Sequence, residues 1–146
     1  MYKNYSQLLA DLNSNATTCA KVVQDYIAKI EEKKHLNAFL EVFEQSALQK
    51  AKEVDEKIGK GTAGKLAGFV VGIKDNICYE GHKVSASSKI LEGFESLYSA
   101  TAVERLLNED AIIIGRLNCD EFAMGSSNEN SSKGNVLNPI QEDKVP

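Results

Sequence analysis

The residue in this chain whose position best suits chemistry is a lysine at the end of a short apolar segment. Lys74 follows the apolar run Phe69–Ile73 and precedes Asp75 and Asn76. A run of this length, bounded by glycine, is typical of a strand buried on both faces. Lys74 is therefore predicted at the carboxyl end of a strand, where open α/β sheets bind ligands. Burial there would favour the neutral amine, a base or nucleophile. The alternative is a lysine that only marks the strand's exit into solvent.

A second polar stretch follows another apolar segment. Residues 111–114 are apolar, Gly115 is predicted to end their strand, and residues 118–132 are rich in serine, asparagine and acids. If strands 69–73 and 111–114 are parallel neighbours, this stretch and Lys74 lie at the same edge of the sheet. Hydroxyls and amides at such an edge suit hydrogen bonding to a substrate. An ordinary surface loop rich in serine and asparagine is the other interpretation.

The elements that position these two stretches form a predicted β-α-β unit. It consists of strand 69–73, a helix over 100–108 and strand 111–115, with a right-handed connection and a parallel strand pair. Residues 75–98 are rich in serine and glycine and show weak periodicity. Irregular connections of this length are usually functional or mobile.

The first part of the chain is predicted to be mainly helical. All ten glycines lie between Gly59 and Gly134, and both prolines lie near the end, so residues 1–58 lack the strongest helix breakers. Apolar spacing predicts helices over 5–12, from Thr17 or Thr18 to about 34, and over 45–58, with a strand at 37–43. The whole chain is thus interpreted as one α/β domain, with a helical segment 1–60 and a β-α-β core 61–146.

Composition excludes several classes of protein. The net charge is −4 and the excess of acids lies within residues 61–146, so no basic patch indicates nucleic-acid binding. Three separated cysteines, Cys19, Cys78 and Cys119, argue against a disulfide framework and for a reducing compartment. His35 and His82 have no partners at metal-ligand spacing, so no metal site is predicted. Without a signal peptide or an apolar run of membrane length, the chain is interpreted as cytoplasmic.

The motifs that remain leave a lysine base as the chemistry to consider. There is no phosphate-binding P-loop, no Gly-x-Ser-x-Gly elbow and no histidine placed to serve a Ser–His–Asp triad. A lysine can replace histidine as the base that activates a serine. That scheme needs a serine nucleophile and an oxyanion hole, and Ser85, Ser87 and Ser88 lie in a segment without a strand-to-helix elbow.

Two blocks of sequence resemble a known family. Residues 68–76 resemble the segment Gly-hydrophobic-Pro-Val-Gly-Ile-Lys-Asp-Asn of the amidase signature enzymes, with Val70 where proline is common. Residues 118–131 resemble a block of one branch, the glutaminase (A) subunits of glutamyl-tRNA(Gln)/aspartyl-tRNA(Asn) amidotransferases. The resemblance continues through residues 99–115 and departs from the pattern at Lys133, where an aromatic residue is usual.

The resemblance implies a fold and roles for particular residues. The fold would be a mixed β-sheet core flanked by helices, of which this chain is the N-terminal portion. Lys74 matches the lysine of a Ser–cis-Ser–Lys triad, in which it accepts a proton, through the cis-serine, from the serine nucleophile. Met124, Ser126 and Ser127 match the family loop near the glutamine site. The family's Gly-Gly-Ser-Ser stretch follows a Val-Pro such as residues 145–146, so both serines are expected to be missing and the isolated chain inactive.

The resemblance also implies partners. The glutaminase subunit would hydrolyse glutamine through an acyl-enzyme and pass ammonia to a partner, within a complex that also holds amidotransferase subunits B and C. The partner would hold the misacylated tRNA and use ATP and magnesium, so no cofactor is expected in this chain. Two alternatives stay open: a free-standing amidase acting on another carboxamide, and a non-catalytic truncated piece or assembly module.

Overall fold

The computed structural model describes residues 2–146; Met1, the first residue of the segment predicted to be mainly helical, lies outside them. The chain divides into two compact units, each built from separated stretches. The helical unit comprises the residues up to Glu32 with 43–71 and 104–114, and the loop unit comprises residues 33–42, 72–103 and 115–146. The division into 1–60 and 61–146 stays a prediction.

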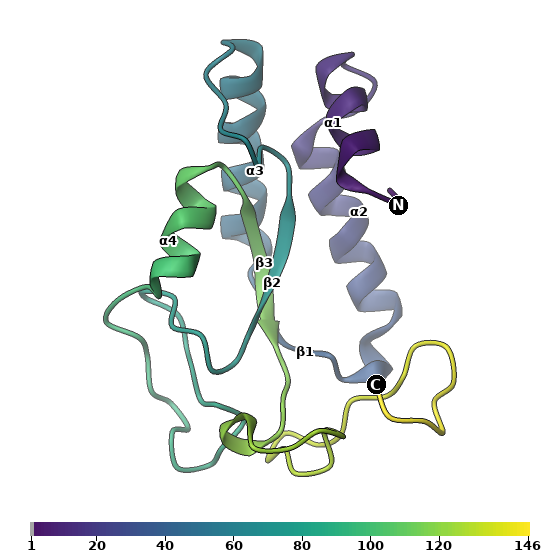
Figure 1. Ribbon diagram of the computed structural model, residues 1–146, viewed down its shortest axis with the longest axis vertical. Helices are drawn as coiled ribbons and strands as arrows, with labels where there is room; N and C mark the ends of the chain where they lie inside the picture. Colours follow the sequence, from purple (N-terminus) through teal and green to yellow (C-terminus); the bar gives the residue numbers. More distant parts are fainter. Residues whose placement is uncertain (1) are drawn as a thin grey trace. The chain divides into compact units, whose positions relative to one another are not determined.

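The elements follow the order expected of an α/β chain (Figure 1). The helices are α1 (Tyr5–Asn13), α2 (Cys19–Glu32), α3 (Glu44–Gly59) and α4 (Thr101–Asn108), with short 3-10 turns η1 (Lys34–Leu36) and η2 (Glu121–Ala123). The strands are β1 (Phe39–Val42), β2 (Val70–Lys74) and β3 (Ile112–Leu117). Every helix and strand predicted from apolar spacing is present, with bounds shifted by a few residues.

Side-chain caps explain why α2 begins where it does. The Thr18 hydroxyl accepts a hydrogen bond from the N–H of Lys21 at 3.1 Å. The carboxylate of Asp55, on α3, accepts from the N–H groups of Cys19 and Ala20 at 2.6 and 3.1 Å. These bonds satisfy N–H groups that a helix start leaves unpaired, and the negative charge suits this end of the helix dipole. Helices α2 and α3 consequently pack side by side in the helical unit (Figure 1).

The buried carboxylate of Asp110 holds three parts of the helical unit together. Asp110 is 2% exposed and accepts hydrogen bonds from Lys57 Nζ at 2.7 Å, Lys50 Nζ at 3.2 Å and the N–H of Gly64 at 2.9 Å. Burial alone raises the pKa of Asp110, but the donors on Lys57, Gly64 and Lys50 outweigh it and hold the pKa below its ordinary value. Helix α3, the loop before β2 and the turn into β3 are thereby joined.

The strands form a mixed sheet of order β1-β3-β2. Strand β1 runs antiparallel to β3. Strands β2 and β3 are parallel, because the N–H of Ile112 donates to the carbonyl of Phe69 at 2.8 Å and the N–H of Asp75 donates to the carbonyl of Leu117 at 2.9 Å. The parallel pair of the predicted β-α-β unit is therefore confirmed, and the antiparallel β1 makes the sheet mixed, as the family resemblance implied.

The prediction that Gly115 ends the second strand is wrong. Strand β3 continues through Gly115 to Leu117, and Gly115 lies opposite Val42 of β1. A Cβ at this position would overlap the carbonyl oxygen of Glu41 and press against the Phe39 ring. The glycine therefore permits a close approach of β1, a role that glycine within a strand often has.

Replacing Gly115 by alanine should separate β1 from β3. We expect Gly115→Ala to lower the free energy of unfolding by about 1–3 kcal/mol, as overpacking does in other proteins. The matched control is Gly59→Ala. Gly59 is the last residue of α3, and a Cβ added there meets nothing within 4 Å. This variant should be neutral or should stabilise the fold by up to about 1 kcal/mol. Urea denaturation of both variants measures the difference, and equal midpoints would contradict the close approach.

The depressed pKa of Asp110 predicts a pH dependence of stability. A carboxyl group whose pKa is lower in the folded state stabilises the fold above its unfolded pKa of about 4, and this contribution is lost as pH falls through the folded pKa. Asp110→Asn should therefore cost about 1–3 kcal/mol at pH 7, and the difference from the unmodified chain should shrink below about pH 4.

Unfolding measured at several pH values provides the test. Glu56→Gln is the control, because the Glu56 side chain is 71% exposed and pairs with the exposed Lys60. A cost of Asp110→Asn that stays constant down to acid pH would contradict the assignment.

Candidate active site

Lys74 is the last residue of β2, at the carboxyl end of the strand where it was predicted. The chain turns at once, since the N–H of Ile77 donates to the Lys74 carbonyl at 2.9 Å. The Lys74 side chain is exposed, so residues 2–146 do not by themselves remove the amine from water. The lysine therefore lies at the strand exit, as predicted, and the described residues leave open which of the two interpretations of Lys74 holds.

The next residue, Asp75, is fully buried and lies at the centre of a hydrogen-bond network. Its carboxylate accepts from the Ser85 N–H at 3.0 Å, the Ser85 hydroxyl at 2.6 Å, the Ser87 N–H at 2.7 Å and Arg116 Nη1. Burial alone raises the pKa of Asp75, but the bonds from Ser85, Arg116 and Ser87 outweigh it and hold the pKa below its ordinary value. Arg116 also contacts Glu41 at 3.3 Å.

The irregular connection after Lys74 is fixed by this network rather than loose. Residues 84–88 are all buried, and the N–H of Ala86 donates to the Asp75 carbonyl at 2.8 Å. Ala86 and Ser87 have left-handed φ angles of 49° and 50°, which non-glycine residues adopt only when their surroundings impose them. The Ser88 hydroxyl donates to Glu121 at 2.5 Å. The buried hydroxyls of Ser85, Ser87 and Ser88 thus serve the structure.

Asn118 connects this segment to the second polar stretch. Its side-chain oxygen accepts from the hydroxyls of Ser87 at 3.2 Å and Ser131 at 2.6 Å. Its side-chain nitrogen donates to the carbonyl oxygens of Asn37 at 3.2 Å and Gly134 at 2.9 Å. One amide therefore joins the end of β3 to three other segments of the loop unit.

A second buried carboxylate, that of Asp120, closes the loop over residues 120–130. It accepts from the N–H groups of Asn128 and Asn130, both at 2.9 Å. The chain passes so close that a Cβ at Gly125 would overlap the Asp120 side chain. Phe122 is held in a left-handed conformation with φ 52°. The loop is therefore stabilised by hydrogen bonds and close packing, although it has little regular secondary structure.

The three residues predicted to bind substrate lie on this loop. Met124 is 86% exposed, Ser126 is exposed, and the Ser127 hydroxyl donates to Glu129 at 2.6 Å. Lys74 makes no direct hydrogen bond to any of the three within residues 2–146. The structure instead brings the two predicted halves of the site together indirectly, through Asp75, Ser87 and Asn118. The substrate-binding role of Met124, Ser126 and Ser127 stays a prediction.

Sequence reasoning missed the residues of this network. Asp75 and Asn118 belong to the two blocks that resemble the family, but no short-range pattern predicts their hydrogen bonds or the participation of Arg116. The serine content of residues 75–98 is the one sequence signal that points to this network.

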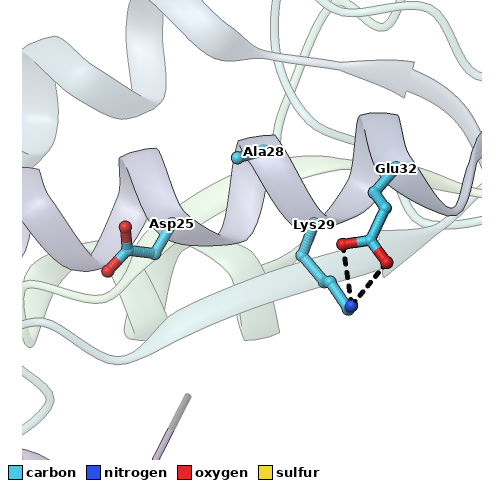
Figure 2. Close-up of a pocket in the computed structure, with 4 residues that line it drawn as sticks. All are labelled: Asp25, Ala28, Lys29 and Glu32. Atoms are coloured by element: carbon cyan, nitrogen blue, oxygen red, sulfur yellow. Dashed lines mark hydrogen bonds and ion pairs between the residues drawn. The ribbon is translucent and has the colours of Figure 1, made fainter.

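The hollow drawn in Figure 2 lies elsewhere, on one face of α2. It is lined by Asp25, Ala28, Lys29 and Glu32. Lys29 Nζ donates to both carboxylate oxygens of Glu32 at 2.8 Å, and Asp25 pairs with Lys21 (Figure 2 shows the former). Because these charges already neutralise one another, we do not assign a substrate site here.

Among residues 2–146, no three or more histidine, cysteine or acidic side chains are grouped to hold a metal ion. No helix in the same range has the length and apolar character needed to cross a membrane.

If Asp120 closes its loop, its replacement should open the loop locally. In Asp120→Asn, one of the two N–H groups must face a carboxamide NH₂ in place of an acceptor. Amide hydrogen exchange at Asn128 or Asn130 should then accelerate about tenfold, because a hydrogen bond to a charged group contributes about 1.5 kcal/mol. The control is Asp143→Asn, at a residue that is 76% exposed and pairs with its neighbour Lys144. Unchanged exchange at both amides would overturn the assignment.

Comparisons with known proteins agree with the arrangement of the elements. A family model described as amidase matches residues 21–146. The A subunit of the glutamyl-tRNA(Gln) amidotransferase of Chlorobaculum parvum is 48% identical over 99% of this chain and 30% of its own length. The chain thus spans about 30% of the length of the curated relatives it matches.

Solved structures are similar as well. The peptide amidase of Stenotrophomonas maltophilia matches with a TM-score of 0.82 and 28% identity over 92% of this chain and 29% of that protein. The A subunit of the glutamyl-tRNA(Gln) amidotransferase of Thermotoga maritima matches with a TM-score of 0.69 and 31% identity over 88% of this chain and 26% of that protein.

Proposed function

Because this chain belongs to the amidase family, we propose that it forms the amino-terminal part of the glutaminase subunit of a tRNA-dependent amidotransferase. The observation that carries the proposal is the 48% identity to the A subunit of a glutamyl-tRNA(Gln) amidotransferase over 99% of the chain. It is supported by the position of Lys74, which ends β2 at the carboxyl edge of a parallel strand pair.

The proposed chemistry is hydrolysis of the side-chain amide of glutamine. In the scheme that the family resemblance implies, Lys74 Nζ takes a proton from a cis-serine, which takes one from the serine nucleophile. The serine oxygen attacks the amide carbon, the proton returns to the departing nitrogen, and ammonia leaves an acyl-enzyme behind. Water then hydrolyses the acyl-enzyme to glutamate. Both serines would lie outside residues 1–146, so the 146-residue chain alone should be inactive.

The Lys74 side chain is exposed within residues 2–146. In the active enzyme, further protein would cover it. Several large apolar side chains of the loop unit are also strongly exposed, among them Ile90, Leu97 and Met124 at 80%, 84% and 86%. Exposed apolar surface of this kind is typical of a face that other protein contacts.

Met124, Ser126 and Ser127 are proposed to contact glutamine. Their loop is held by Asp120 and by Asn118, so its hydroxyls can be presented in a defined arrangement. Hydroxyl groups positioned in this way can hydrogen-bond the polar ends of a small amide substrate.

The proposed partners are amidotransferase subunits B and C, and ammonia would pass to a partner subunit. A misacylated tRNA, ATP and magnesium would be bound by the partner subunit. The net charge of −4 supports this division, since a chain that contacts tRNA directly usually carries a basic surface. In this assignment the protein serves translation, by releasing the ammonia that is used to convert Glu-tRNA(Gln) to Gln-tRNA(Gln).

A free-standing amidase is the second candidate. It is favoured by the similarity to the peptide amidase of S. maltophilia, whose TM-score exceeds that of the amidotransferase subunit from T. maritima. Glutamine hydrolysis that depends on partner subunits would favour the first proposal, and partner-independent hydrolysis of other carboxamides would favour the second. A non-catalytic assembly module would show neither activity in the whole protein.

The decisive variant is Lys74→Met in the whole protein with its partner subunits. Loss of the base should lower kcat for glutamine hydrolysis by about 10²–10⁴-fold, the usual contribution of a general base, with the thermal unfolding temperature unchanged because Lys74 is exposed. The matched control is Lys89→Met, another exposed lysine of the loop unit. Release of ammonia measures the rate, and near-normal turnover of Lys74→Met would exclude the proposed role.

A further inference from the structure

Hydrogen bonds hold both the backbone and the side chain of Asp75, a residue to which the family resemblance gives no role. Its N–H donates to Leu117, its carbonyl accepts from Ala86, and its carboxylate accepts four further hydrogen bonds. The peptide units on both sides of Asp75 are therefore fixed. Because Asp75 directly follows Lys74, the direction in which the lysine leaves β2 depends on Asp75.

The same network reaches the second polar stretch. The Ser87 N–H donates to Asp75, while the Ser87 hydroxyl donates to Asn118 and accepts from the N–H of Cys119, both at 3.2 Å. The Ser87 carbonyl accepts from the N–H of Ser132 at 2.9 Å. Ser87 thus contacts both ends of the 118–132 stretch, and Asp75 holds Ser87.

Charge explains why this position requires aspartate. All four groups that face the carboxylate are donors, and one is the cationic Arg116. An asparagine would turn an NH₂ group toward at least one of these donors, since a carboxamide has only one acceptor oxygen. It would also leave the buried Arg116 without its closest acid.

We propose that Asp75 is a positioning residue that sets the exit of Lys74 from β2 and, through Ser87, holds the loop of Met124, Ser126 and Ser127 in register with the lysine. The proposal rests on the function proposed above, because the position of the loop relative to Lys74 matters only if the loop and the lysine contact the same substrate. A base displaced by about 1 Å loses about 10²-fold in rate, so the effect of Asp75 falls on turnover.

The test uses the whole protein with its partner subunits, and compares Asp75→Asn with Asp110→Asn. Both variants remove a buried carboxylate that accepts from a cation, but Asp110 and its donors Lys50, Lys57 and Gly64 belong to the helical unit. Rates are expressed per folded molecule, from circular dichroism. We expect kcat for glutamine to fall about 10–100-fold in Asp75→Asn and to stay within about twofold in Asp110→Asn.

Ser87→Ala separates the two parts of the proposal and keeps it testable if Asp75→Asn does not fold. It removes the hydroxyl that reaches Asn118 and Cys119 but keeps the N–H that donates to Asp75. KM for glutamine should rise several-fold while kcat changes less than in Asp75→Asn. A merely structural role would instead lower the folded fraction and leave kcat and KM per folded molecule unchanged, which would overturn the proposal.

Hydrogen exchange provides a readout that does not depend on activity. The amides of Cys119 and Ser132 do not touch Asp75, yet both bind Ser87. Their exchange should accelerate in Asp75→Asn and not in Asp110→Asn; unchanged exchange would refute the connection between the loops. If the unmodified whole protein hydrolyses no carboxamide, the proposed function fails, and the exchange result still decides whether Asp75 joins the loops.

Discussion

The local structure of the candidate site depends on one buried negative charge. The carboxylate of Asp75 is fully removed from water, and an ion in such a place costs several kcal/mol unless it is completely hydrogen-bonded. The chain supplies the donors from residues that are far apart in sequence, including Ser85, Ser87 and Arg116. The residues after β2 therefore fold around the carboxylate, and their conformation is defined without helix or strand.

The same solution recurs elsewhere in the chain. Asp110 in the helical unit and Asp120 in the loop unit are also buried, and each accepts hydrogen bonds from backbone N–H groups of an irregular segment. Backbone N–H groups that are buried outside regular structure must find acceptors. A carboxylate offers about four acceptor sites in a small volume, so one aspartate can stabilise a whole turn.

Local patterns predicted the elements because their causes are local. The Ala47–Ala51–Val54 spacing of α3 follows from the helical period and was found in the sequence. The apolar run before Lys74 correctly predicted β2, but the expected burial of this strand on both faces was wrong for the described residues, where Ile73 is buried, residues 70–72 are half-buried and Phe69 is exposed. The role of Gly115 depends on the approach of β1, about 70 residues earlier in the chain. The Asp75–Arg116 pair likewise joins positions that only the sheet brings together, and no short-range pattern encodes it.

The exposure of Lys74 shows how the candidate site divides its tasks. A lysine that serves as a base needs a fixed position and a surrounding that disfavours its charge. Within residues 2–146 the first requirement is met, because Asp75 and the strand pair β2–β3 fix the backbone on either side of the lysine. The Lys74 side chain itself is exposed. Residues 2–146 thus fix the backbone on either side of Lys74 without enclosing its side chain.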